Sequence, residues 1–344
     1  MTATISAIEY HVPSHVLAND ELAQVSDIWS PEKIEAKTGI TERHVASRGE
    51  CSSDLAVAAA EKLFASGAID RDEVDFLLLC TQSPDYLLPT TACLVQERLG
   101  LSNTVGALDI NLGCSGYVYA LGMAKGLVET GQAKNLLLIT ADTYSKFIRD
   151  EDLNVRTLFG DGASATLIRN DQSLTSTGPG IGPMVYGTDG SGAQNLIVKQ
   201  SGLRIFQPDD ETELTDDRGR LFMNGPQIFT FTLKAVPDLV SQLLDRSGRT
   251  LDDVDLFVFH QANQYMLDHL RKKIGIPEDR FVSAMKHSGN TVSSTIPIAL
   301  KHAQLDGRLR ANDTVMLVGF GVGYSWGATF IRPGMLAQPS RAAA

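Results

Sequence analysis

The segment VGALDINLGCSGYVYALGMAKG, residues 105–126, contains in direct succession the patterns of a strand, a sharp turn and a helix. The apolar run of residues 105–110 predicts a buried strand, and the residues after the turn carry apolar side chains at helical spacing. Cys114 stands in the turn. Its small neighbours Gly113 and Gly116 permit a tight backbone and the close approach of a substrate carbonyl. The segment therefore indicates an α/β fold that presents a cysteine at a strand–helix junction.

The position of Cys114 predicts a nucleophile. A thiol at a helix start lies near the positive end of the helix dipole and near unpaired N–H groups, and both favour the thiolate. A cysteine beside a helix is more often a small buried hydrophobic residue, so this residue taken alone leaves a packing role open. The other cysteines, which show neither CxxC pairing nor histidines at metal spacing and so predict no metal site and no disulfide framework, are Cys51, Cys80 and Cys93.

Composition limits the class of protein. The chain has 344 residues, of which 43% are hydrophobic, which suits a soluble enzyme with two domains or one large duplicated domain. The formal net charge of −11 argues against nucleic acid as the main partner. No apolar run approaches the roughly 20 residues that span a bilayer, and the first residues lack a secretory pattern, so we expect a cytoplasmic protein.

The second half of the chain repeats patterns of the first half. Residues 72–80, DEVDFLLLC, correspond to residues 252–260, DDVDLFVFH, and each segment follows a helical pattern that ends in glycine. FGDGASATLI from Phe159 is similar to FGVGYSWGATFI from Phe320. We therefore predict an internal duplication, with a mainly parallel sheet in each half. The expected halves are residues 1–170, with Cys114, and residues 171–344.

Several other elements can be placed from the sequence. We predict a strand over residues 3–12, short helices over residues 19–37, a helix over residues 53–66 and a strand over residues 75–81. Residues 171–219 are rich in Gly, Pro, Ser, Thr and Asp, so we expect surface loops and short strands there. The last seven residues, 338–344, are expected to form a frayed tail.

Three further features could carry chemistry. His260 follows the apolar strand of residues 256–259, so its imidazole is expected at the carboxyl end of a strand, where open α/β sheets bind ligands. Asn290 lies in a polar turn before a predicted helix, and its amide can donate without changing charge. The glycine-rich turn of residues 320–323 offers backbone N–H groups to a developing oxyanion. Each feature alone also fits a structural histidine or an ordinary turn.

Taken together, the motifs resemble a known family. NLGCSGYVYAL around Cys114, HQAN at His260, GNTVSSTIP around Asn290, and the glycine-rich motifs at Phe159 and Phe320 resemble β-ketoacyl-acyl-carrier-protein synthase III in order and separation. The resemblance extends over residues 5–332. It implies the thiolase fold, in which two similar halves form a five-layered αβαβα core, and a homodimer.

The resemblance also implies a mechanism and its residues. Cys114, His260 and Asn290 would form the catalytic triad of a decarboxylative Claisen condensation, with an acyl group carried on Cys114. The backbone N–H groups of Cys114 and Val322 would hold the carbonyl oxygen. His260 and Asn290 would stabilise the enolate of a malonyl unit. The substrates would be acyl-coenzyme A or acyl-carrier-protein thioesters, with no tightly bound cofactor and no metal.

Some positions differ from the family pattern. Val322 stands where the family usually has glycine. The coenzyme A clamp of the family matches Lys33, Lys37 and the region of Gln264 and Tyr265, and one clamp arginine falls at Leu153, with Arg156 nearby. Stacking on adenine and bidentate binding of phosphate are therefore in doubt.

Two surface features follow from the resemblance. Arg271, Lys272 and Lys273 match the basic patch that docks an acyl carrier protein, although a solvated helix end would look the same. Leu88 matches a position that reaches the acyl tunnel of the partner subunit. An aliphatic side chain there would admit a longer or branched acyl chain.

Two other functions remain open at this stage. The first is transfer of the acyl group without decarboxylation to an alcohol, amine or carbon nucleophile in secondary metabolism. The second is a catalytically silent partner subunit, which the presence of all three polar residues disfavours.

Overall fold

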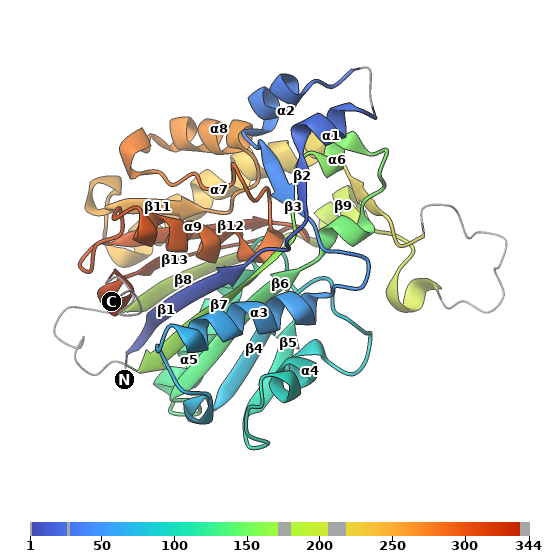
Figure 1. The fold of residues 1–344 in the computed structure, drawn as a ribbon. Coiled ribbons are helices and arrows are strands. Elements are labelled where there is room, and N and C mark those ends of the chain that lie inside the picture. Colours follow the sequence, from blue (N-terminus) through green and yellow to red (C-terminus); the bar gives the residue numbers. More distant parts are fainter. Residues whose placement is uncertain (1, 26–27, 171–179, 206–217, 338–344) are drawn as a thin grey trace.

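The computed structural model describes residues 2–25, 28–170, 180–205 and 218–337 (Figure 1). Its strands form a five-stranded sheet in the order β1-β7-β6-β4-β5 and a four-stranded sheet in the order β11-β12-β13-β8. Two small ribbons, β2-β3 and β10-β9, lie outside the large sheets. The strands are β1 (Ala3–His11), β2 (Val16–Ala18), β3 (Glu42–His44), β4 (Phe76–Cys80), β5 (Gly106–Ile110), β6 (Asn135–Asp142), β7 (Gly162–Asn170), β8 (Ile181–Thr188), β9 (Leu196–Val198), β10 (Leu221–Met223), β11 (Leu256–Phe259), β12 (Val315–Gly321) and β13 (Ser325–Ile331).

The α-helices alternate with these strands along most of the chain. They are α1 (Asn19–Ala23), α2 (Pro31–Thr38), α3 (Ser52–Ala65), α4 (Thr91–Arg98), α5 (Gly116–Glu129), α6 (Leu153–Arg156), α7 (Gly225–Ser247), α8 (Gln264–Ile274) and α9 (Thr295–Leu305). Helix α2 begins as predicted, since the Ser30 side chain accepts a hydrogen bond from the Lys33 N–H and Pro31 occupies the first turn. Gly67, with φ +73°, follows α3.

The two large sheets share one pattern of strand directions. In the first sheet β4 runs parallel to β5 and β6, whereas β7 is antiparallel to β6 and β1. In the second sheet β11 runs parallel to β12, and β13 is antiparallel to β12 and β8. The prediction of mainly parallel sheets was therefore wrong. The short turn between β12 and β13 allows only an antiparallel pair, because a parallel crossover needs a dozen residues or more.

Helices and sheets alternate in five layers (Figure 1). Helices α3 and α4 cover the outer face of the first sheet, while α5 and α9 lie between the two sheets. Helix α7 covers the outer face of the second sheet and packs against α8. One group of buried apolar side chains surrounds the central helices α5 and α9 and contacts both sheets, and two further groups fill the spaces between each sheet and its outer helices. The five-layered αβαβα core is confirmed.

Two expected elements differ from the structure. Strand β5 was predicted to be buried, but all its residues are half-buried, because it is an edge strand that pairs only with β4. Strand β8 lies within the region expected to form surface loops and short strands, but it is eight residues long and completes one edge of the second sheet. Gly182, Pro183 and Gly187 concealed its strand pattern. The predicted boundary at residues 170/171 is not tested, since residues 171–179 lie outside the described residues, as does the predicted tail.

Candidate active site

Cys114 lies between β5 and α5, where the predicted turn places it, and the end of β12 packs tightly against it. A Cβ atom added to Gly321 would lie 2.7 Å from Cys114 Cβ and 3.0 Å from its Sγ. A Cβ atom on Gly319 would lie 2.8 Å from Ser115 Cα. Because real Cβ atoms do not approach so closely, both positions require glycine. Without side chains at these two positions, β12 can pack directly against the thiol.

The Cys114 thiol accepts hydrogen bonds from its own backbone N–H and from that of Val322. These are the two donors predicted for an oxyanion, so a β-branched residue at Val322 leaves backbone donation intact. Burial, with a smaller contribution from Asp142, raises the pKa of Cys114 to about 12, although both N–H groups act to lower it. The expectation that the helix start favours a resting thiolate is therefore wrong, because desolvation outweighs the N–H donors.

His260 lies directly after β11 and is buried. Its Nδ1 lies 2.7 Å from Thr295 Oγ1, and this hydroxyl lies 3.1 Å from the Val292 carbonyl, to which it can also donate. When the hydroxyl donates to Nδ1, the ring proton is on Nε2. Burial lowers the pKa of His260 to about 3, so the imidazole is neutral at physiological pH.

Asn290 is held by backbone and side-chain hydrogen bonds. Its N–H donates to the Leu158 carbonyl at 2.9 Å, and its own carbonyl accepts from the Gly160 N–H at 3.0 Å. The side-chain Oδ1 accepts from the Val292 N–H at 3.0 Å, which leaves the Nδ2 amide group to donate elsewhere. Val292 has φ +55°, a left-handed conformation that costs a β-branched residue about 1–3 kcal/mol.

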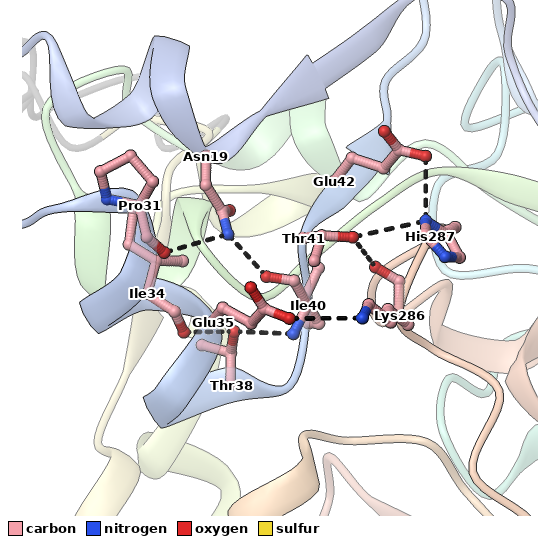
Figure 2. Close-up of polar contacts among 10 residues, drawn as sticks. All are labelled: Asn19, Pro31, Ile34, Glu35, Thr38, Ile40, Thr41, Glu42, Lys286 and His287. Carbon is pink, nitrogen blue, oxygen red and sulfur yellow. Dashed lines mark hydrogen bonds and ion pairs between the residues drawn. The ribbon is translucent and has the colours of Figure 1, made fainter.

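The loop before Asn290 is tied to the segment between α2 and β3, as Figure 2 shows. Thr41 donates from its N–H and its hydroxyl to the Lys286 carbonyl, at 2.9 and 3.0 Å. Lys286 pairs with Glu35 at 3.4 Å, and His287 lies 3.2 Å from Glu42. The first half of the chain therefore fixes the loop that carries Asn290.

The three predicted catalytic side chains line one cavity of about 60 Å³. Cys114 comes from the first half of the chain, and His260 and Asn290 come from the second. The remaining walls are mostly apolar. Four of their residues lie in motifs that the sequence singled out, namely Phe159, Ala262, Asn263 and Phe320, together with Gly321 of the turn expected to bind an oxyanion. Sequence reasoning did not identify the others, which are Leu158, Leu196, Met223, Ile228, Thr232 and Met266. A small apolar cavity with a thiol, an imidazole and an amide suits a reaction that excludes water.

Asp142 is a buried acid near the site that sequence reasoning also missed. It ends β6, accepts a hydrogen bond from the Gln82 N–H at 2.8 Å, and accepts from both the N–H and the hydroxyl of Ser293. Burial raises its pKa to about 7, against the lowering effect of these donors. Asp142 stands at the carboxyl end of a strand, where open α/β sheets bind ligands, and this position could have identified it from the sequence. Asp142 connects the first sheet to the segment that follows Asn290.

A wider recess of about 610 Å³ adjoins the cavity and shares with it Leu158, Met223, Ile228, Asn263 and Met266. Lys37 and Tyr265, two positions of the expected coenzyme A clamp, line this recess. Within the described residues, the other clamp positions do not: Lys33 donates to the Ile28 carbonyl, Leu153 is buried, and Arg156 pairs with Asp150 at 3.2 Å. Lys37 Nζ lies 4.5 Å from the centre of the Trp29 ring.

The predicted docking residues lie in the last turn of α8. Arg271 pairs with Glu278 at 3.0 Å, and Lys273 donates to the Leu233 carbonyl at 2.7 Å, whereas Lys272 is exposed. Leu88 is 84% exposed and lies beside exposed Tyr86 and Leu87. It does not line the Cys114 cavity of its own chain, so its predicted role depends on a partner subunit.

Comparisons with known proteins identify the family. Residues 108–190 match the family model described as 3-oxoacyl-[acyl-carrier-protein (ACP)] synthase III, and residues 244–333 match the model of its C-terminal part. β-Ketoacyl-[acyl-carrier-protein] synthase III 3 of Streptomyces coelicolor is 39% identical over 319 residues, which are 92% of this chain and 93% of that protein. The chain belongs to the β-ketoacyl-acyl-carrier-protein synthase III family. It is an acyl-transferring enzyme of the condensing class.

Solved structures of synthase III proteins agree with this assignment. One 3-oxoacyl-(acyl-carrier-protein) synthase III is 51% identical, with a TM-score of 0.92, and the match covers 96% of this chain and 100% of that one. The 3-oxoacyl-(acyl-carrier protein) synthase of Burkholderia xenovorans is 37% identical, with a TM-score of 0.88 and coverage of 98% and 95%. The thiolase-like fold of the synthase III family is thus confirmed. Among the described residues, no helix is long and apolar enough to cross a membrane.

Proposed function

We propose that this synthase III family member catalyses the decarboxylative Claisen condensation of an acyl thioester with a malonyl thioester, through an acyl group on Cys114. The observation that carries the proposal is the shared cavity of Cys114, His260 and Asn290. Family membership supports the reaction class, and the geometry supports the assignment of roles.

In the first step the Cys114 sulfur attacks the thioester carbonyl. A new Sγ–C bond forms, the bond to the carrier sulfur breaks, and the thiol proton ends on the departing carrier thiol. The carbonyl oxygen becomes negative in the transition state and accepts from the N–H groups of Cys114 and Val322, which bind the thiol at rest. These donors are fixed by the backbone, so they need no rearrangement during the reaction.

In the second step a malonyl thioester occupies the cavity beside acyl-Cys114. Its carbon–carboxylate bond breaks, carbon dioxide leaves, and the electron pair passes into an enolate. The enolate oxygen accepts hydrogen bonds from His260 Nε2–H and Asn290 Nδ2–H, both neutral donors. The enolate carbon then attacks the acyl carbonyl and forms a carbon–carbon bond, the Sγ–C bond breaks, and a β-ketoacyl thioester leaves. The released Cys114 thiolate takes up a proton from solvent, which restores the thiol.

The proposal includes thioester substrates on a carrier protein or on coenzyme A, without a tightly bound cofactor. The recess beside the cavity supports a substrate arm that passes Lys37 and Tyr265. Exposed Lys272, together with Arg271 and Lys273, is the proposed docking site for an acyl carrier protein. The charge-reversing change Lys272→Glu should raise KM for carrier-linked substrates a few-fold and leave kcat unchanged; equal KM values in both proteins would contradict docking there.

We also propose a homodimer. The unpaired edge of β5 and the exposed side chains of Tyr86, Leu87 and Leu88 support an interface on this side of the first sheet. In that dimer Leu88 would enter the acyl tunnel of the partner subunit. Sedimentation should give twice the chain mass of 37.2 kDa, and a monomer at micromolar concentration would contradict the interface.

The experiment that tests the function combines two measurements. Intact-protein mass spectrometry after exposure to acyl-coenzyme A and acyl-carrier-protein thioesters should show one acyl adduct. Subsequent addition of a malonyl thioester should release carbon dioxide and remove the adduct. An adduct without release of carbon dioxide would favour non-decarboxylative transfer, and the absence of any adduct would favour a silent subunit.

A further inference from the structure

A second recess, of about 470 Å³, is lined by four basic side chains and by no carboxylate. The four basic residues are Lys125 of α5, Arg246 at the end of α7, Arg249 after α7, and Arg332 after β13. Apolar side chains, among them Ile181 and Phe330, form the rest of its wall. We call this place the basic recess. The chain carries 41 acidic and 30 basic residues, so a recess lined by basic residues and by no acidic residue is not expected from its composition.

The basic recess is remote from the proposed catalytic cavity. Strands β12 and β13 pair from Gly321 and Ser325, beside Cys114, to Val315 and Ile331, beside the recess. Seven residues of strand span roughly 20 Å. Ile181 begins β8 and Ile331 ends β13, so the recess lies at this end of the second sheet. A ligand there would not contact the substrate of the proposed condensation.

Its arginines form no ion pair within the part of the chain that the structure describes, although Asp253 interacts electrostatically with Arg249. Among the described residues, Arg246, Arg249 and Arg332 form no ion pair, whereas Lys125 pairs with Glu129. The Arg249 guanidinium lies over the Phe330 ring, 5.6 Å from its centre, which holds it in place. Glu129 and Asp253 offset part of the positive charge at Lys125 and Arg249. Arg246 and Arg332 form no ion pair in the described part of the chain, so a bound anion would lower the repulsion among these like charges.

We propose that the basic recess binds a small molecule that carries a diphosphate or two neighbouring phosphate groups. Guanidinium groups match phosphate oxygens in bidentate geometry, and three arginines, two at or just after the end of α7 and one after β13, suit more than one phosphate. Phe330 and Ile181 provide an apolar wall for the organic part of the ligand. The recess volume lies within the usual range of small-molecule sites, which favours a soluble ligand over a lipid surface.

Calorimetric titration of the full chain with inorganic pyrophosphate tests this site. We expect one binding event, weakened about tenfold by Arg246→Gln and about tenfold by Arg332→Gln, because each change removes charge-assisted hydrogen bonds. Arg48→Gln is the matched control, since Arg48 is also exposed but lies outside the recess, and it should leave the affinity unchanged.

Three outcomes would overturn the proposal. They are the absence of pyrophosphate binding at millimolar concentration, equal affinities in the two recess variants and the wild type, and an equal loss in Arg48→Gln. Vesicles of phosphatidylglycerol serve as a second probe, and binding to vesicles without binding of pyrophosphate would assign the recess to a lipid headgroup instead. Thermal unfolding of each variant checks that the fold is retained, and adduct formation at Cys114 should be equal in all of them.

Discussion

The two halves of this chain share a pattern of strand directions, in a five-stranded and a four-stranded sheet, but contribute different chemistry to one cavity. The first half presents the Cys114 thiol at a strand–helix turn. The second half presents His260 after β11 and Asn290 before α9, both as neutral hydrogen-bonding groups. In the proposed mechanism the first half therefore provides the nucleophile, and the second half provides the two side chains that stabilise the enolate.

The two halves also resemble each other in one electrostatic respect. Burial raises the pKa of Cys114 and lowers that of His260, so it disfavours the charged form of each group. The resting cavity is consequently uncharged at these two groups, and the negative charge on the substrate oxygens develops only during the reaction. Fixed neutral donors are effective in such a setting, because little water screens them.

Removing the thiol should abolish the contribution of the first half. Cys114→Ala should lower condensation about 10⁴-fold, because no acyl intermediate can form. Intact-protein mass should show no adduct with any thioester. Cys93→Ala is the control, since Cys93 is an exposed thiol outside the cavity, and it should acylate normally. An adduct on Cys114→Ala would place the nucleophile elsewhere.

Removing the imidazole of His260 should slow the malonyl condensation step and leave acylation of Cys114 unchanged. His260→Ala should lower condensation about 10³-fold, because the enolate oxygen loses one of its two donors. The acyl adduct on Cys114 should still form, and single-turnover assays can measure the two steps separately. A loss of acylation as large as the loss of condensation would contradict the division between the halves.

Thr295 should act as a positioning residue for His260. Thr295→Val keeps the shape of the side chain but removes the group that contacts Nδ1 at 2.7 Å, so condensation should fall up to about 10²-fold. Thr295→Ser should restore most of the rate. The fall should appear in kcat for the malonyl step, with acylation unchanged, and failure of serine to rescue would indicate a packing role instead.

The thiol in the first half should behave as a weak acid. The pKa of Cys114 is raised to about 12. At any pH below this value, its thiolate fraction therefore grows about tenfold for each unit by which the pH rises. Alkylation of Cys114 by iodoacetamide should therefore accelerate about tenfold from pH 8 to pH 9. Peptide mass mapping can follow this residue separately from Cys93, and a rate that is constant above pH 7 would show a lowered pKa.

The sequence predicted those features of the fold that depend on local pattern. The helix start at Ser30 and Pro31 was visible because capping is local. The edge position of β5 was not visible, because its apolar pattern does not reveal which strands pair with it. The length of β8 and its place in the second sheet were missed, because Gly182, Pro183 and Gly187 are residues typical of loops and this strand depends on its pairing with β13.

The sequence predicted which residues form the site, but it did not predict their burial or the contacts that position them. Cys114, His260 and Asn290 could be selected from motifs, and they do line one cavity. Thr295 and Asp142 were missed, because they contact His260 and Ser293 across 35 and 151 residues of sequence. The resting thiolate was a wrong expectation, because desolvation depends on the packing of the second half around Cys114.

Asn290→Ala offers the most direct test of the claim that Cys114 accepts the acyl group while His260 and Asn290 stabilise the enolate. In one reaction with an acyl thioester followed by a malonyl thioester labelled in its free carboxylate, intact-protein mass reports the acyl-Cys114 adduct and trapped label reports carbon dioxide. We predict that the variant acylates at nearly the wild-type rate, retains its adduct, and releases carbon dioxide about 10²–10³-fold more slowly. Release of carbon dioxide and loss of the adduct at wild-type rates would contradict the account.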